Sequence, residues 1–160
     1  IFSVGIAIGS IAVNRMLGGK VAARFAPASV IVMGCFVVAF HVVCRMWNSG
    51  VPENALMTLH DFVAHQHALL LLSTLLGIAI SGGMFVVPLY AFLTTTVPKS
   101  HAARTVAANN IVNSGSMVAG SVITLGMSFM GIDVVNQLLF AAAMCLVSAW
   151  LGWKLHCACD

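Results

Sequence analysis

Five long apolar segments constrain what this chain can fold into, because each approaches the roughly 20 residues that a helix needs to cross a bilayer. They cover residues 1–17, 29–47, 68–97, 105–130 and 132–155. Backbone groups in hydrocarbon must pair within their own segment, so each segment is predicted to be a helix. Membrane β-barrels show alternating strands of about ten residues instead. The predicted fold is therefore an all-α, polytopic membrane helix bundle with five transmembrane helices.

The composition predicts a surface that faces lipid. Charged residues make up 7% of the 160 residues and hydrophobic residues 61%, and the mean hydropathy is +1.05. A soluble domain carries about 25% charged residues, so membrane lipid is the expected surrounding of this chain. The seven Lys and Arg residues are dispersed, and no nucleic-acid partner is expected.

The start of the chain predicts a fragment of a longer protein. An apolar run begins at Ile1, and neither a Met nor a basic segment precedes it. This differs from a secretory signal peptide and is typical of a sequence that begins inside a helix. Residues 1–160 contain no separate soluble domain and no short repeat, so we expect one partial transmembrane unit. A sixth helix before Ile1 would complete a six-helix unit.

Charge sign predicts the orientation, since cytoplasmic loops are enriched in Lys and Arg. Basic residues gather at the first and third connections and after the fifth segment: Lys20, Arg24, Lys99, Arg104 and Lys154. Five crossings place all three positions on one side, and the acidic Glu53, Asp61 and Asp133 on the other. The C-terminus is therefore predicted to be cytoplasmic in a multi-pass membrane protein.

A stripe of polar and small residues follows one side of the fourth segment. Its members are spaced by four, four, three and four positions: Thr105, Asn109, Asn113, Ser116 and Gly120. At 100° per residue they fall within an arc of about 80°. Side-chain amides are costly in hydrocarbon, so this side is predicted to face other helices or a water-filled cavity.

Two roles remain open for this stripe. Small and polar residues allow close helix packing and hydrogen bonding between helices. Alternatively, Asn109 and Asn113 line a translocation path, where amides that both donate and accept suit a neutral or zwitterionic headgroup.

The first and third segments carry related signals. Gly5 and Gly9 form a GxxxG step that predicts a close helix contact, and Asn14 lies on the opposite side of the same segment, towards a cavity. In the third segment the stretch "GGMFVVPLYAF" predicts a kink, because Pro88 removes a backbone donor one turn after Gly82 and Gly83. Its Tyr90 hydroxyl would need a polar partner if buried, which makes Tyr90 a candidate for the path.

The runs "GGMFVVPLYAFL", "PKSHAAR", "AANNIVNSGSMVAGS" and "NRMLGGKVAARFAP" resemble the lysophospholipid transporter branch of the major facilitator superfamily. They look closest to versions fused ahead of a glycerophospholipid acyltransferase. The resemblance implies that the five segments are the last five of twelve helices, and that the N-terminal half is missing. It also implies a carrier that flips lysophospholipids across the bacterial inner membrane, with a fused or associated acyltransferase as partner. The superfamily's cytoplasmic turn pairs an acid with an Arg, whereas "GGKVAARFAPAS" has no acid.

Other functions remain open. A drug or metabolite exporter of the same superfamily, or a membrane anchor for an acyltransferase, would share the same helices. His60, Asp61, His65 and His67 cluster in one predicted outer loop, but their spacing matches no zinc motif, and a short helix on the membrane surface is the favoured interpretation. His41 is expected to be a packed, hydrogen-bonded side chain. We predict no cofactor, no metal and no enzymatic activity in this segment.

Overall fold

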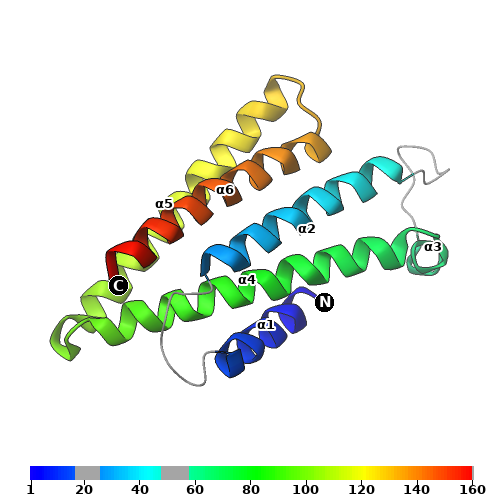
Figure 1. Cartoon of the computed structure of the whole chain (residues 1–160). Coiled ribbons are helices and arrows are strands. Elements are labelled where there is room, and N and C mark those ends of the chain that lie inside the picture. The colour runs from blue at the N-terminus through cyan, green and yellow to red at the C-terminus, as the bar shows by residue number, and fades with distance from the viewer. Residues whose placement is uncertain (17–25, 48–57, 160) are drawn as a thin grey trace.

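The computed structural model describes residues 1–16, 26–47 and 58–159, and these residues form helices joined by short turns (Figure 1). No strand occurs in this part of the chain. The helices are α1 (Phe2–Met16), α2 (Ala26–Met46), α3 (Leu59–Ala64), α4 (Ala68–Thr96), α5 (Lys99–Phe129) and α6 (Val134–Cys159). The all-α prediction is confirmed, and all five predicted segments are helical.

Four helices, α2, α4, α5 and α6, are long and apolar enough to cross a membrane. α1 is apolar but has 15 residues, which at 1.5 Å per residue cover about 22 Å, less than the hydrocarbon thickness of about 30 Å. The described residues thus contain four helices that could span a membrane and one shorter apolar helix, and the predicted count of five spanning helices is not confirmed.

Four of the helices form a row in the order α1, α4, α2 and α6, in which each helix packs against the next (Figure 1). Small residues make these contacts possible. An added Cβ at Gly5 would lie 2.5 Å from Ala79 Cβ, and one at Gly83 would lie 2.6 Å from the Ile6 carbonyl oxygen. The contact predicted from the Gly5–Gly9 step is confirmed, and its partner is α4.

The contact between α2 and α6 also depends on small side chains. Ala142, Cys145 and Ala149 are buried at spacings of three and four, and Val30 packs against the last two. An added Cβ on Gly34 would lie 3.3 Å from Cys145 Cβ. In addition, His41 Nδ1 lies 2.7 Å from the Val135 carbonyl oxygen, so the predicted hydrogen-bonded role of His41 is confirmed.

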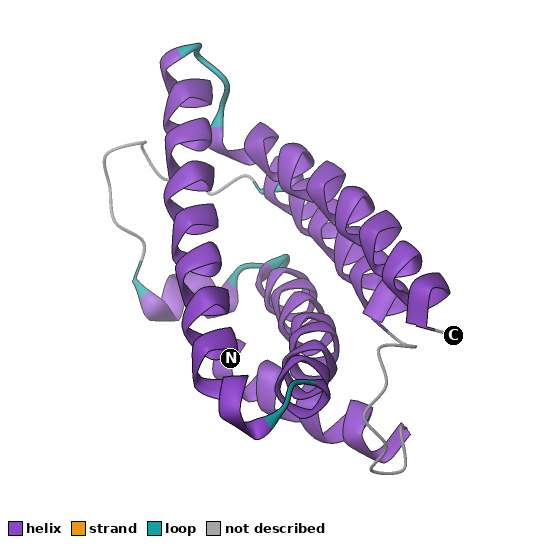
Figure 2. Cartoon of the chain, turned by 90° about the vertical axis from the view of Figure 1, so that its left-hand side faces the viewer, coloured by secondary structure: helices purple, strands orange, loops and turns teal. Residues whose placement is uncertain are grey.

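α5 differs from the other long helices because none of its described residues is buried. Among the described helices, its neighbours are only α4 and α6, the two helices joined to it in sequence. Figure 2 shows α5 as the long helix that leads from the end of α4 to the turn before α6 and stands apart from the row. Within the described part of the chain the polar stripe is therefore only partly covered: Thr105, Asn109 and Gly120 are half-buried, whereas Asn113 and Ser116 are exposed.

The turn between α5 and α6 is a Schellman motif. The Ile132 N–H donates to Met127 O at 3.0 Å, and the Gly131 N–H donates to Ser128 O at 3.0 Å. Gly131 has a φ of 78°, the left-handed conformation that glycine adopts most readily. The side-chain amide of Gln137 also donates to Ser128 Oγ at 2.8 Å, so α5 is fixed to α6 at this end.

The directions of the helices place successive connections at opposite ends of the bundle, as predicted from the number of crossings. Figure 1 shows the ends of α1 and α4 and the C-terminus at one end of the bundle. Arg15 lies in the last turn of α1, and Arg104 and Lys154 lie near the start of α5 and the end of α6. Asp133 lies at the opposite end, in the turn before α6. Lys20, Arg24 and Glu53 lie outside the described residues.

Candidate functional site

A groove with a volume of about 480 Å³ lies between α4 and α5. Three of the predicted path residues, Tyr90, Asn109 and Asn113, come together here. Its lining residues are Phe85, Val86, Leu89, Tyr90, Phe92, Leu93, Asn109, Asn110 and Asn113. The groove therefore has an apolar, aromatic wall on α4 and an amide wall on α5.

The α4 wall follows from helical spacing. Phe85, Leu89 and Phe92 recur at intervals of four and three, so they lie on one side of α4. Tyr90 lies about 100–160° around the helix from these three residues, so it lines the edge of the groove, where it is 44% exposed. One turn later, the Thr94 hydroxyl donates to the backbone carbonyl oxygen of Tyr90 at 3.0 Å, so the Thr94 hydroxyl is paired within its own helix.

The α5 wall carries three side-chain amides. Asn109 is half-buried, and Asn110 and Asn113 are exposed. Each amide offers two donor hydrogens and one acceptor oxygen. None of the groove's lining residues carries a charge at neutral pH, so the groove suits a neutral or zwitterionic polar group better than an isolated charge.

Two predicted path residues lie elsewhere. Asn14 is exposed on α1 and does not line the groove. Ser116 is exposed one turn beyond Asn113, and its hydroxyl donates to Val112 O at 2.8 Å. The structure thus brings together Tyr90, Asn109 and Asn113, and leaves Asn14 and Ser116 apart from them.

The predicted kink residues lie inside α4, which continues as an α-helix through all three. Gly83 and Pro88 are buried, and Gly82 is half-buried. Gly83 permits the close approach of α1, whereas the nearest atom to an added Cβ on Gly82 is Met33 Sδ at 3.8 Å. The kink itself stays a prediction.

The predicted basic residues within the described chain lie at the start of α5. Lys99 is the first residue of α5, and Arg104 is exposed one turn before Asn109. Lys20 and Arg24 lie outside the described residues. Arg104 is thus the described basic side chain that lies nearest to the amides along α5.

The apolar wall of the groove was not predicted from the sequence. Tyr90 was predicted, but Phe85, Leu89 and Phe92 were not, although the spacing of these three apolar residues places them together on one side of α4. Asn110 was likewise not among the path residues, because it lies one residue away from the main stripe. A helical projection that included apolar residues would have found both sets.

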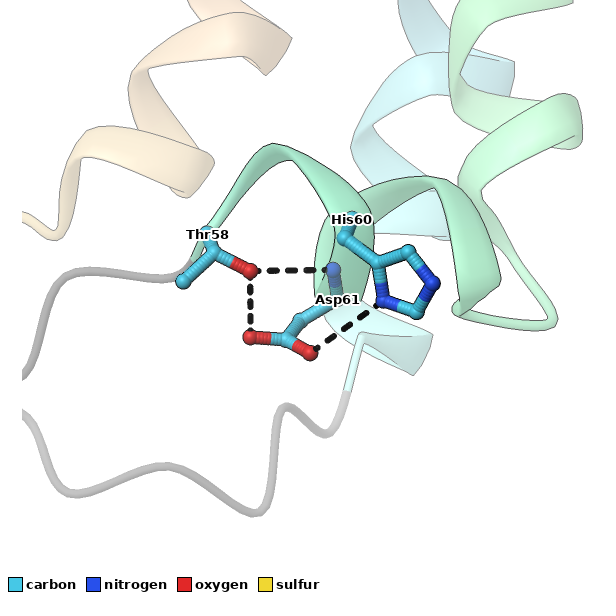
Figure 3. Close-up of polar contacts among 3 residues, drawn as sticks. All are labelled: Thr58, His60 and Asp61. Carbon is cyan, nitrogen blue, oxygen red and sulfur yellow. Dashed lines mark hydrogen bonds and ion pairs between the residues drawn. The ribbon is translucent and has the colours of Figure 1, made fainter.

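The histidines around α3 do not form a metal centre in the described part of the chain, where no three His, Cys, Asp or Glu residues gather closely enough to hold an ion. Figure 3 shows that Asp61 is engaged with its neighbours instead. Thr58 Oγ1 donates to Asp61 Oδ2 at 2.6 Å, and His60 Nδ1 lies 3.9 Å from Asp61 Oδ1. The predicted short helix in this loop is confirmed as α3.

Comparison of the chain with protein-family models, curated proteins and solved structures finds no match.

Proposed function

We propose that this chain is part of a membrane carrier that flips lysophospholipids across the bacterial inner membrane by alternating access. The groove between α4 and α5 is the observation that carries the proposal. A lysophospholipid has one acyl chain and one polar headgroup, and the groove offers an apolar wall with Phe85 and Leu89 opposite the amides of Asn109 and Asn113. Tyr90 adds a hydroxyl on the apolar side.

The exposure of α5 supports a second component of the proposal. An amide-bearing side of a membrane helix is costly in contact with acyl chains, and in the described chain Asn110, Asn113 and Ser116 on α5 are exposed. An N-terminal half of the same carrier would cover it and close the groove from the opposite side. Rocking of two such halves around a central site is the usual mechanism of secondary transporters.

The charge distribution supports an orientation with the C-terminus in the cytoplasm. Arg15, Arg104 and Lys154 lie towards one end of the helices, and Arg45 lies in the last turn of α2 at the other. The positive-inside rule assigns the end with more basic residues to the cytoplasm. The groove then lies nearer the cytoplasmic ends of α4 and α5. A product released there would meet an acyltransferase that restores the diacyl lipid.

The test measures the uptake of a fluorescent lysophosphatidylethanolamine into vesicles. The vesicles contain the protein in the full form that the cell makes. Asn109→Leu and Asn113→Leu remove groove amides, and Asn136→Leu is the matched control because Asn136 lies on α6 outside the groove. Losing one neutral hydrogen bond costs about 1–1.5 kcal/mol, so each groove variant should lower the uptake rate by roughly tenfold. The control should retain the rate of the unsubstituted protein.

Two results would contradict the proposal. Unchanged uptake in both groove variants would favour a chain that only anchors an acyltransferase. No lysophospholipid uptake by the unsubstituted protein, together with efflux of a drug or metabolite, would favour an exporter of the same superfamily.

A further inference from the structure

The short helix α3 has two chemically different sides. At 100° per residue, Leu59, Phe62 and Val63 fall within an arc of about 100°, and His60 and Asp61 lie outside it. Leu59 is 80% exposed and Val63 is 63% exposed, although both are large apolar residues. The side chains of His60 and Asp61 are also exposed, so both the apolar and the polar side of α3 are available to the surroundings.

α3 is held firmly against the row of helices. The Phe62 ring lies 5.5 Å from the Trp47 ring, and the His65 ring stacks on Trp47 at 4.0 Å with an interplanar angle of 16°. Thr58 caps the helix by accepting a hydrogen bond from the Asp61 N–H at 3.2 Å. These contacts fix the direction in which Leu59 and Val63 project.

The position of α3 relative to a bilayer follows from α4. Figure 1 shows α3 nearly end-on while α4 runs across the view, so α3 lies crosswise to the membrane-spanning direction. α4 begins at Ala68 with Leu69, which is 81% exposed. Such a residue in the first turn of a spanning helix faces acyl chains, so the edge of the hydrocarbon lies close to α3.

The apolar surface continues beneath α3. A pocket of about 350 Å³ is lined by Cys44, Trp47, Phe62 and Leu71, contributed by α4, α3 and the end of α2. Trp is enriched at the boundary between membrane and water. Leu59, Val63 and Leu69 therefore extend a lipid-facing surface from α4 onto α3.

We propose that α3 lies in the headgroup region of the leaflet that borders the start of α4, with Leu59 and Val63 inserted among the acyl chains. The partner of this surface is bilayer lipid, because the surface is continuous with the lipid-facing side of a membrane-spanning helix. His60 and Asp61 face water. Interfacial helices of this type place their apolar side about 5–10 Å into the boundary between headgroups and acyl chains.

The test places the environment-sensitive fluorophore NBD on single cysteines in the full chain, with the five native cysteines replaced by alanine. Leu59→Cys and Val63→Cys report on the proposed inserted side, and His60→Cys is the matched control one residue away. All three sites are exposed, so labelling leaves the helix packing intact. The labelled proteins are reconstituted in phosphatidylcholine vesicles. Their NBD fluorescence is then quenched with aqueous iodide or with lipids that carry a nitroxide on the acyl chain.

The proposal expects nitroxide lipids to quench positions 59 and 63 severalfold more strongly than position 60, and iodide to show the reverse order. Equal iodide quenching at all three positions would overturn it, because α3 would then lie in water. Protection of positions 59 and 63 from both quenchers would also overturn it, since protein rather than lipid would then cover this side.

Discussion

Replacing Gly83 by alanine tests the contact between α1 and α4 directly. The added Cβ would lie 2.6 Å from the Ile6 carbonyl oxygen and 3.1 Å from Ile6 Cα. Both atoms belong to the backbone, so no side chain can rotate away. Ordinary contact begins at 3.4 Å, and α1 would therefore have to move by about 0.8 Å, the difference between 3.4 Å and 2.6 Å.

Gly82 provides a matched control in the same helix. An added Cβ there meets only Met33 Sδ, at 3.8 Å, which is the flexible end of a side chain. Both substitutions gain up to about 1 kcal/mol of helix propensity, but only Gly83→Ala incurs the overpacking cost of about 1–3 kcal/mol. The two variants should thus differ in their free energy of unfolding by about 2 kcal/mol, and Gly83→Ala should be the less stable.

The assay is equilibrium unfolding in mixed micelles, with a denaturing detergent as titrant and helical circular dichroism as the signal. Helix content before the transition should be equal in the two variants, because the substitution separates helices without breaking them. Equal stability of Gly83→Ala and Gly82→Ala would refute the close approach of α1 to α4 at this point.

The same unfolding assay checks two further contacts. His41→Phe keeps an aromatic ring but loses the hydrogen bond to Val135 O, and should lower the free energy of unfolding by about 0.5–1.5 kcal/mol. A variant as stable as the unsubstituted protein would contradict this role. Gly131→Ala meets no neighbouring atom within 4 Å, but its φ of 78° should make it less stable by about 1–2 kcal/mol. Gly131→Asn should lower the free energy of unfolding by less than Gly131→Ala, because asparagine tolerates this backbone conformation. Equal losses of stability in the two variants would show that the backbone conformation is not the sole cause.

The helices could be located from the sequence because the signal for a membrane span is the length of an apolar run. This signal does not depend on which helices pack beside it. Boundaries were less accurate. α5 begins at Lys99 rather than at residue 105, since the helix continues through "SHAAR", whose polar residues ended the apolar run. α2 begins at Ala26, with Pro27 in the first turn, where its missing N–H removes no intrahelical hydrogen bond.

The order of helices in the row could not be predicted in this way. Gly5 and Gly9 predicted a contact but not its partner, because apolar surfaces all round a span leave many partners equivalent. The pairing of α2 with α6 depends on the fit of Gly34 to Cys145, which is a property of shape. For the candidate site, Tyr90, Asn109 and Asn113 were found because polar groups are rare in spans, whereas the apolar residues opposite them have no such contrast.

The isolation of α5 has a mechanical consequence. Since α5 touches only the helices joined to it in sequence, its middle turns can be displaced sideways with little loss of packed surface. Asn109 and Asn113 would move with α5 while Tyr90 stayed with α4, so the tilt of one helix sets the width of the groove. The thickness of a bound molecule and the angle of α5 are thereby linked, and a bulkier occupant would hold the helix further from the row.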